Sequence, residues 1–259
     1  MIEGLKRCQI NGIRRGLRSW YGRPLGQALL KQERQQLDTI LPTLFGYHII
    51  QMGYLSGHDL MASSRIRNQL LLDADSEGET PSPAAYAYPD AMPIESGSVD
   101  VVLLPHTLEF ERQPHQILRE ADRVLIPEGH VVVLGFNPWS LWGIWRLCRC
   151  FKGKAPWCGD FLSLTRIKDW MALLGFDVVL VRRHFFRPPI QRRGILKKLA
   201  FMEKLGAKLW PRLSGAYILV ARKRVSTLTP IRPRWRPRRT LVGDLTPTTR
   251  STRSHVRGR

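Results

Sequence analysis

The stretch that decides the fold is SVDVVLLPHTLEFERQPHQILREADRVLIPEGHVVVLGF, residues Ser98 to Phe136. Two short apolar runs rich in β-branched residues, Val99–Leu104 and Val131–Phe136, are typical of parallel strands buried on both faces. Between them, apolar residues recur at helical spacing after Pro114, which a helix accepts in its first turn. Pro127-Glu128-Gly129 ends that helix and turns the chain. The stretch therefore predicts a βαβ unit, whose ligands bind at the carboxyl ends of the strands.

Further strands and helices are expected on both sides of this unit. Five more runs have the composition of strands: 47–52, 68–72, 84–88, 176–181 and 216–221. Amphipathic or apolar-striped helices are predicted over 25–41, 165–174 and 195–209. Seven strands with intervening helices predict one doubly wound α/β domain.

Charge and composition divide the chain into three parts. Residues 1–24 are basic and weakly patterned and predict a loose or helical arm, 25–224 form the domain, and 225–259 predict a disordered tail. The chain has 41 Lys and Arg against 21 Asp and Glu, a net charge of +20. Of this, +11 lies in Arg222–Arg259, where prolines and dense arginine leave too little apolar surface to order the chain.

Composition also excludes several classes. Four cysteines, Cys8, Cys148, Cys150 and Cys158, are too few and too clustered for a disulfide framework, which favours reduced thiols in the cytoplasm. A metal site at the last three is disfavoured because they contain no C-x-x-C pair. No apolar run is long enough for a membrane span.

A candidate ligand site follows the first strand. Gly53 and Gly57 occupy the turn after it. Because glycine has no side chain, the backbone of such a turn can approach a ligand closely. An ordinary strand-to-helix turn explains these glycines equally well. Asp73 lies 20 residues beyond Gly53, at the end of the second strand, where a carboxylate binds ribose hydroxyls in nucleotide-binding sheets. A solvated loop aspartate is the competing interpretation, and Asp75 is an alternative for the role.

Several motifs together resemble the type 11 methyltransferase domain family, class I S-adenosylmethionine-dependent methyltransferases. The carrying segments are DAMPI (90–94), SVDVV (98–102), HTLEF (106–110) and RVLIPEG (123–129), similar to the family's DA-x-x-LPF, SFDVV, H-x-L-E-H and RVL-x-PGG. The resemblance covers about residues 41–224, and GFNPWSLWG (135–143) is similar to an uncharacterised bacterial subgroup. It implies a Rossmann-like sheet of strand order 3-2-1-4-5-7-6, with the seventh strand antiparallel.

The resemblance also implies a cofactor, S-adenosylmethionine, and its site residues. Gln51, Gly53 and Gly57 would line the methionine part and Asp73 would face the ribose. Asp90 and Ala91 would lie beside the adenine, and Leu104 and Pro105 near the sulfonium. The chain departs from the family's first motif at Gln51, which stands where an acidic residue is usual, and it lacks the middle glycine.

His106 is the candidate catalytic residue. It is the titratable side chain at the elbow after the fourth strand, and its pKa suits a base if the acceptor must lose a proton. A histidine that positions other groups is the alternative and the favoured interpretation. Methyl transfer needs little acid–base chemistry, because the sulfonium is already activated and alignment of donor and acceptor supplies roughly 7–11 kcal/mol.

Two aromatic features remain open. Trp139, Trp142 and Trp145 are spaced three apart, which favours one helix face packed on the sheet over an aromatic wall for an apolar acceptor. In the tail, arginines around Trp235 suit weak, salt-sensitive binding of single-stranded nucleic acid, and a merely solvated tail is equally consistent.

The sequence therefore predicts a cytoplasmic S-adenosylmethionine-dependent methyltransferase that acts on a small-molecule acceptor, with no resident metal. The alternative is a catalytically weakened relative that serves as a nucleic-acid-binding or regulatory module. A nicotinamide-dependent oxidoreductase is disfavoured because the dinucleotide fingerprint G-x-G-x-x-G is absent.

Overall fold

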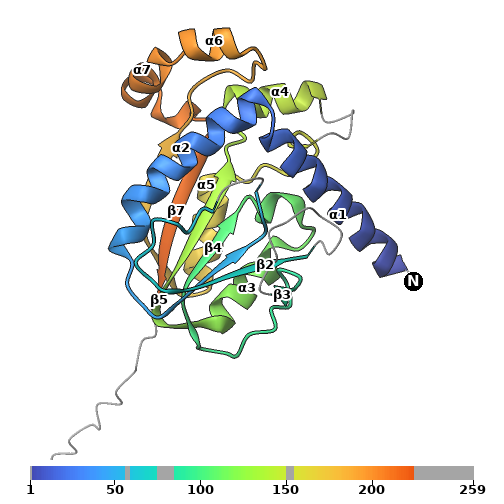
Figure 1. The fold of residues 1–259 in the computed structure, drawn as a ribbon, viewed down its shortest axis with the longest axis vertical. Helices are drawn as coiled ribbons and strands as arrows, with labels where there is room; N and C mark the ends of the chain where they lie inside the picture. The colour runs from blue at the N-terminus through green and yellow to red at the C-terminus, as the bar shows by residue number, and fades with distance from the viewer. Residues whose placement is uncertain (1, 56–58, 75–84, 150–154, 225–259) are drawn as a thin grey trace, which may run out of the picture. The chain divides into compact units, whose positions relative to one another are not determined.

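Seven β-strands form one sheet in the computed structural model, which describes residues 2–55, 59–74, 85–149 and 155–224 (Figure 1). The strands are β1 (His48–Met52), β2 (Asn68–Asp73), β3 (Ala85–Tyr86), β4 (Val99–Pro105), β5 (Leu125–Phe136), β6 (Phe176–His184) and β7 (Ala216–Lys223). Their order is β3-β2-β1-β4-β5-β7-β6. β1 to β5 pair in parallel, and β7 is antiparallel to both β5 and β6. The doubly wound class, the strand order and the reversed last strand are confirmed.

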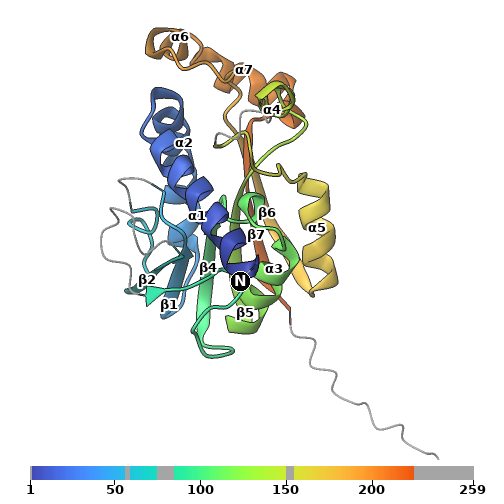
Figure 2. The ribbon, with the colours of Figure 1, turned by 90° about the vertical axis from the view of Figure 1, so that its right-hand side faces the viewer.

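Helices cover both faces of the sheet (Figure 2). The helices are α1 (Ile2–Tyr21), α2 (Pro24–Ile40), α3 (Pro114–Val124), α4 (Leu141–Arg149), α5 (Leu164–Leu173), α6 (Arg193–Lys198) and α7 (Phe201–Leu209), with the short 3₁₀ helices η1 (Leu41–Thr43), η2 (Leu108–Phe110) and η4 (Pro211–Leu213). α1 and α2 lie on one face and α3 and α5 on the other, while α4, α6 and α7 gather at one end. No helix in the described ranges has the length and apolar character needed to cross a bilayer.

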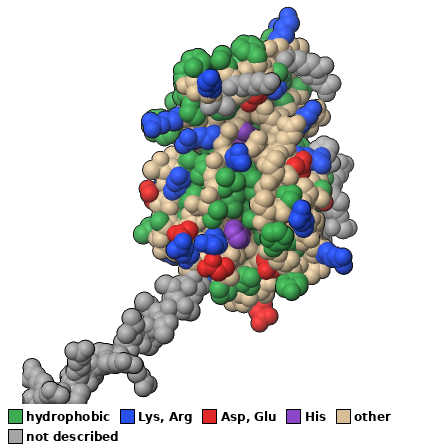
Figure 3. Space-filling view, turned by 90° about the vertical axis from the view of Figure 1, so that its left-hand side faces the viewer, with side chains coloured by type: hydrophobic (Ala, Val, Ile, Leu, Met, Phe, Trp, Pro, Cys, Tyr) green, Lys and Arg blue, Asp and Glu red, His purple; other side chains and the backbone are tan. Residues whose placement is uncertain are grey.

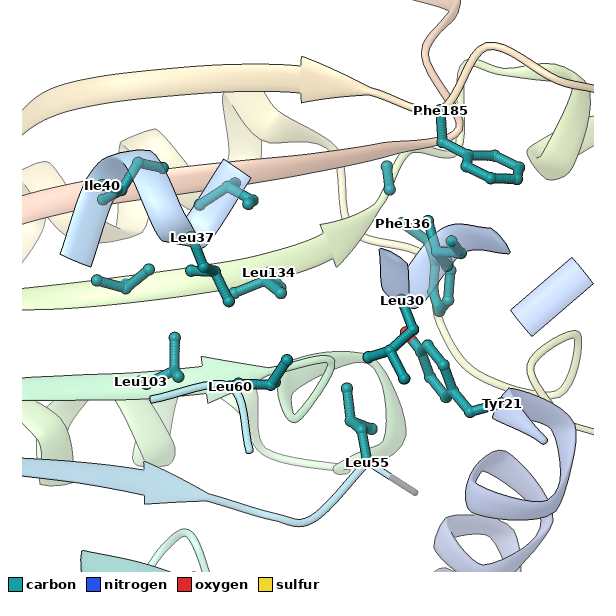
Figure 4. Close-up of a cluster of buried hydrophobic side chains, with 14 of the residues drawn as sticks. Tyr21, Leu30, Leu37, Ile40, Leu55, Leu60, Leu103, Leu134, Phe136 and Phe185 are labelled. Atoms are coloured by element: carbon teal, nitrogen blue, oxygen red, sulfur yellow. The ribbon is translucent and has the colours of Figure 1, made fainter. Parts of the chain in front are cut away.

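Two apolar cores result, because successive side chains of a strand point to opposite faces. Leu103 and Leu134 belong to the core under α1 and α2, where Figure 4 shows them near Leu37. Their neighbours Leu104 and Val133 belong to the core under α3 and α5. This alternation explains why β4 and β5 read as continuous apolar runs in the sequence.

The structure corrects the expected turn at Pro127-Glu128-Gly129. The helix does end before it, but β5 already begins at Leu125, so these residues lie inside the strand. The pairing with β4 shifts there, since Val99 pairs with Leu125 whereas Val101 pairs with His130. A bulge thus absorbs the extra residues of β5, and Glu128 adopts a positive φ of 65° within it.

The amino-terminal residues form part of the domain core. The sequence placed the start of the domain at residue 25, whereas residues 1–225 form one compact unit. Trp20 and Tyr21, at the end of α1, are buried. Trp20 meets Phe136 and Trp142 edge-on, at ring-centroid distances of 6.4 and 5.8 Å. The predicted disorder of 225–259 concerns residues outside the described part of the chain.

Two expectations for the second half of the chain are wrong. The single helix predicted over 195–209 is two helices, α6 and α7, which are separated at Leu199 and Ala200. The three tryptophans do not share a packed helix face, because Trp142 is buried whereas Trp139 and Trp145 are exposed. Trp139 precedes α4, so helical spacing does not apply to it.

Candidate functional site

Three neighbouring strands end around one small cavity. Gly53 follows β1, Asp73 ends β2, and Pro105 and His106 form the elbow after β4, and all four residues line the cavity. They meet because β1 lies between β2 and β4 in the sheet. The cavity volume is about 30 Å³, which accommodates one or two water molecules rather than a nucleoside.

The remaining residues proposed from the sequence lie elsewhere. The described residues that line this cavity do not include Gln51, Leu104, Asp90 or Ala91. Gln51 is buried and its Nε2 donates to the Gly53 carbonyl at 2.9 Å. Leu104 lies in the core under α3 and α5. Asp90 is half-buried and Ala91 exposed in the turn after β3. Gly57 lies outside the described residues.

Helix α1 closes the cavity. Three of its side chains line it: Arg14, Leu17 and Arg18. The Arg18 guanidinium forms an ion pair with the fully buried Asp73 carboxylate, and its Nε donates to the Tyr54 carbonyl at 3.2 Å. Arg14 pairs with Glu111 beside η2. The carboxylate expected to face a ribose is therefore bound to a side chain of the same molecule.

Sequence reasoning missed these residues of α1. Their spacing, Arg14, Leu17 and Arg18, places them on one face of a helix, and that signal was available. The spacing alone does not say which surface the face covers.

His106 lies in a buried network of charges. Its φ of 48° is in the left-handed region, which is uncommon for a residue with a side chain. This backbone turns the ring so that Nε2 lies 2.8 Å from Glu33 Oε1, while Nδ1 lies 3.5 Å from Glu109 Oε1. Glu109 Oε1 also accepts from the Phe136 amide at 2.6 Å, and the Tyr21 hydroxyl donates to Glu33 at 3.3 Å.

The two carboxylates decide the protonation of His106. Burial alone lowers its pKa, but Glu33 and Glu109 outweigh burial and raise the pKa of His106 to about 9. The ring therefore carries its proton at neutral pH, and its two N–H groups face carboxylates. Such a ring holds α2, η2 and the β4 elbow together and has no free nitrogen with which to accept a proton.

A second buried histidine has the opposite shift. His184 ends β6 and is buried, and neither ring nitrogen has a hydrogen-bond partner within the described part of the chain. The pKa of His184 is lowered to about 4, mainly by burial; Glu33 opposes this shift and nearby His106 adds to it. Its ring is neutral at physiological pH.

The donors around the cavity fit S-adenosylmethionine in type. Asp73 offers two oxygens suited to ribose hydroxyls. The Oε1 atom of Gln51 is buried without a partner among the described residues, so one acceptor remains available beside the β1 turn. Gly53 adopts a φ of 89°, and a Cβ built there meets its nearest neighbour only at 4.0 Å, so the turn is open to a ligand. The obstacle is α1, not the chemistry of the strand ends.

Metal ligands do not cluster in the part of the chain that is described, where no group of three His, Cys, Asp or Glu side chains is arranged to hold an ion. Of the cysteines Cys148, Cys150 and Cys158, Cys150 lies outside the described residues.

The sequence is similar to a known protein domain family and to one curated bacterial protein. A family model described as "Methyltransferase domain" matches residues 68–133, from the start of β2 to three residues before the end of β5. The uncharacterized protein YafS of Escherichia coli (strain K12) is 33% identical over 210 residues, which cover 81% of this chain and 82% of that protein.

Solved structures share the fold at low sequence identity. A possible histamine N-methyltransferase of Thermotoga maritima is similar with a TM-score of 0.55 and 16% identity, covering 73% of this chain and 88% of that one. A complex of the Haloferax volcanii Trm112 activator with a putative methyltransferase contains a chain with a TM-score of 0.57 and 16% identity, covering 82% and 98%. An S-adenosylmethionine-dependent methyltransferase of Mesorhizobium loti has a TM-score of 0.51 and 15% identity, covering 73% and 96%. The relative aligned over most of its length shows that this chain belongs to the same family as YafS, residues 68–133 match the methyltransferase domain model, and the strand order is that of the class I methyltransferase fold.

Proposed function

We propose that this chain is an S-adenosylmethionine-dependent methyltransferase whose cofactor binds at the ends of β1, β2 and β4. The observation that carries the proposal is Asp73. It is a buried carboxylate at the end of the strand beside β1, and it lines a cavity together with Gly53 and Pro105. Ligands of doubly wound sheets bind at this edge, and a carboxylate in this position accepts hydrogen bonds from ribose.

The residues around the cavity have distinct roles in this proposal. Asp73 holds the ribose, while Gly53 and Gln51 face the methionine part, a set to which the sequence adds Gly57. Asp90 and Ala91 border the adenine from the turn after β3, and Leu104 and Pro105 support the elbow beneath the sulfonium. The bound cofactor supplies an activated methyl group, and the protein's task is to align an acceptor with it and to exclude water.

Helix α1 must leave the cavity before the cofactor enters. A volume of about 30 Å³ is far below the roughly 300 Å³ of a small-molecule site. The Arg18–Asp73 ion pair has to break at the same step. A site that a helix of the same chain covers suits a small-molecule acceptor better than a macromolecular one.

His106 acts by position in this proposal. Its raised pKa and its two carboxylate partners leave it protonated, so it fixes the elbow on which the acceptor pocket is built. A catalytic role as a base requires that the ring first lose its proton. The dependence of the rate on pH therefore distinguishes the two roles.

Calorimetry tests the cofactor site. S-adenosylmethionine and S-adenosylhomocysteine are titrated into the wild-type chain, the Asp73→Asn variant and a matched control, Asp169→Asn, whose carboxylate is exposed on α5. We expect binding to the wild type and the control, and about tenfold or greater weakening in Asp73→Asn, because a hydrogen bond to a charged group is lost. Thermal melting of each variant verifies folding.

The same titration addresses the alternative, a nucleic-acid-binding or regulatory module that has lost turnover. That alternative depends mainly on the basic residues after Arg222, of which 225–259 lie outside the described part of the chain. If the folded wild type binds neither compound at millimolar concentration, the methyltransferase proposal fails and the alternative gains support.

A further inference from the structure

Exposed apolar side chains gather on one end of the molecule. Ten of the sixteen large hydrophobic residues that are exposed among the described ones lie on α4, α7 and the segments that flank them. We call this set the apolar end: Trp139, Leu141, Ile144, Trp145, Leu147, Phe201, Leu205, Leu209, Trp210 and Leu213. Isolated exposed leucines are ordinary on protein surfaces, but a concentration on two adjoining helices marks an interaction site.

The apolar end is continuous across the two helices. Leu141 of α4 lines the same groove as Leu205 of α7 and Leu213 of η4, and the groove has a volume of about 380 Å³. Trp210 also lines this groove and is 55% exposed, while Trp139 and Trp145, before and within α4, are 76% and 40% exposed. Figures 1 and 2 show that α4, α6 and α7 stand together beyond the end of the sheet, so a flat partner can reach them at once.

The charges beside these apolar side chains are almost all positive. Residues 182–213 include ten Lys and Arg and a single acidic residue, Glu203. Glu203 forms an ion pair with Arg187 at 3.0 Å, so it is already neutralised within the protein. Exposed cations on or next to α6 and α7 include Lys198, Lys208 and Arg212. Figure 3 shows hydrophobic and basic side chains side by side at this end of the molecule.

A polar hollow adjoins the apolar end and is suited to an anionic group. Arg183 and Arg212 line it together with Trp139, and its volume is about 360 Å³. Ser214 also lines it, and the buried Ser214 hydroxyl has no hydrogen-bond partner in the described part of the chain. Two guanidinium groups, an unpartnered hydroxyl and an exposed tryptophan are chemically matched to a phosphate that lies at an apolar boundary.

We propose that the apolar end docks on an anionic phospholipid surface, with α4 and α7 lying in the plane of the bilayer interface. Amphipathic helices with Trp, Phe and Leu beside Lys and Arg insert their apolar faces at the level of the headgroups. The cations bind lipid phosphates and the tryptophans occupy the boundary between water and hydrocarbon.

Two other occupants suit the surface less well. A second copy of the chain would bring two strongly basic surfaces together, and like charges repel. Single-stranded nucleic acid stacks its bases on aromatic rings and arginines, whereas half of the apolar end is leucine. An anionic bilayer satisfies both the aliphatic and the cationic side chains.

Vesicle flotation of the full chain tests the proposal. The vesicles contain phosphatidylcholine alone or phosphatidylcholine mixed with phosphatidylglycerol. We expect strong binding only to the mixed vesicles, together with quenching of tryptophan fluorescence by brominated phosphatidylcholine placed in them. Quenching reports insertion, and because the basic tail itself carries Trp235, the measurement is made in a Trp235→Phe background so that only tryptophans of the domain contribute.

Two variants and two matched controls separate the apolar and charged contributions. Leu209→Gln with Trp210→Gln removes two exposed apolar groups, and Lys208→Glu with Arg212→Glu reverses two exposed charges. The controls are Leu173→Gln, an exposed leucine on α5, and Arg119→Glu with Lys168→Glu on α3 and α5. Each test variant should reduce vesicle affinity about tenfold or more, and the apolar variant should also lose quenching. The tail is present in every variant.

Five outcomes would overturn the proposal. The first is no binding to mixed vesicles, and the second is unchanged affinity and quenching in the Leu209→Gln, Trp210→Gln variant. The third is a wild-type dimer, seen by light scattering, that this variant converts to a monomer. The fourth is equal loss of affinity in the test variants and their controls. Tighter binding of poly(U) RNA than of vesicles, weakened by the same apolar variant, also counts against a bilayer.

Discussion

At the scale of single residues, Arg18 has the greatest influence on the proposed cofactor site. Its guanidinium pairs with Asp73, which is the carboxylate that a ribose would need. Removing the guanidinium removes this ion pair, so the cofactor no longer has to break it on entry. We expect Arg18→Gln to lower the Kd for S-adenosylhomocysteine about fivefold or more, since a charged hydrogen bond contributes roughly 1.5–3 kcal/mol.

The matched control is Arg112→Gln, an exposed arginine beside η2. It should leave the Kd of the wild type unchanged in the same calorimetric titration. Weaker binding of S-adenosylhomocysteine by Arg18→Gln would contradict the view that Arg18 and the cofactor compete for Asp73. It would instead indicate that Arg18 binds the cofactor's carboxylate.

His106 and His184 predict how stability depends on pH. The pKa of His106 is raised to about 9 from 6.5, so its contribution is complete below pH 6.5 and is lost as the pH rises to 9. The pKa of His184 is lowered to about 4, so its contribution is complete above pH 6.5 and is lost as the pH falls towards 4. Each limb amounts to roughly 3 kcal/mol, and the free energy of unfolding should be greatest near pH 6.5.

Urea denaturation at a series of pH values measures both limbs. His106→Gln should flatten the decline between pH 7 and 9, whereas His48→Gln, which replaces an exposed histidine at the start of β1, should preserve it. If the decline persists in His106→Gln, another group causes it.

Residues of the site differ in how far sequence alone could place them. Gly53, Asp73, Pro105 and His106 meet in the structure because each lies at the end of a strand or directly after it, and strand ends are readable from apolar runs and spacing. Arg18 lies 55 residues before its partner Asp73 and belongs to a helix whose own pattern does not name the surface it covers. The protonation of His106 was likewise out of reach, since it depends on Glu33, 73 residues away.

At the scale of elements, the hairpin of α1 and α2 depends on a close approach at Gly26. A Cβ at this position would lie 2.4 Å from the Trp20 carbonyl oxygen and 2.5 Å from the Tyr21 Cα, both of them backbone atoms. Gly26→Ala should therefore lower the free energy of unfolding by about 1–3 kcal/mol, because α1 is forced away from α2. Chemical denaturation measures the change.

Gly12→Ala is the matched control on α1. A Cβ there meets no atom within 4 Å, so alanine should be neutral or should stabilise the helix by up to about 1 kcal/mol. Equal effects of the two substitutions would show that the packing of α1 on α2 contributes little to stability.

Elements that rest on repeating apolar patterns were predictable, and irregular ones were not. β4, α3 and the core of β5 follow from apolar spacing between Val99 and Phe136. The early start of β5 at Leu125 could not be predicted from the sequence, because Pro127 and Gly129 are disfavoured inside a strand. A bulge is what allows them to lie there. The break between α6 and α7 was missed for the converse reason, since the apolar spacing continues across it.

At the scale of the whole molecule, the covering helix α1 is joined to the apolar end through aromatic contacts. Trp20 of α1 meets Trp142 of α4 at a centroid distance of 5.8 Å. Trp142 in turn stacks on Phe136 at 5.6 Å and meets Phe185 edge-on at 5.3 Å. Movement of α1 away from the cofactor site and insertion of α4 into a bilayer interface therefore disturb the same packed side chains.

This arrangement predicts that the two proposed events are linked. If docking loosens the packing of Trp142 against Trp20, α1 leaves Asp73 more readily, so mixed phosphatidylcholine and phosphatidylglycerol vesicles should lower the Kd for S-adenosylhomocysteine about fivefold or more. Thermodynamic linkage requires that saturating S-adenosylhomocysteine lower the Kd for the vesicles by the same factor. Trp142→Phe should reduce both effects together, because the smaller ring keeps the core but weakens the contact with Trp20. Unequal factors would show that one of the two titrations reports something other than binding. If the protein binds both ligands and neither ligand changes the Kd for the other, α1 moves independently of the apolar end.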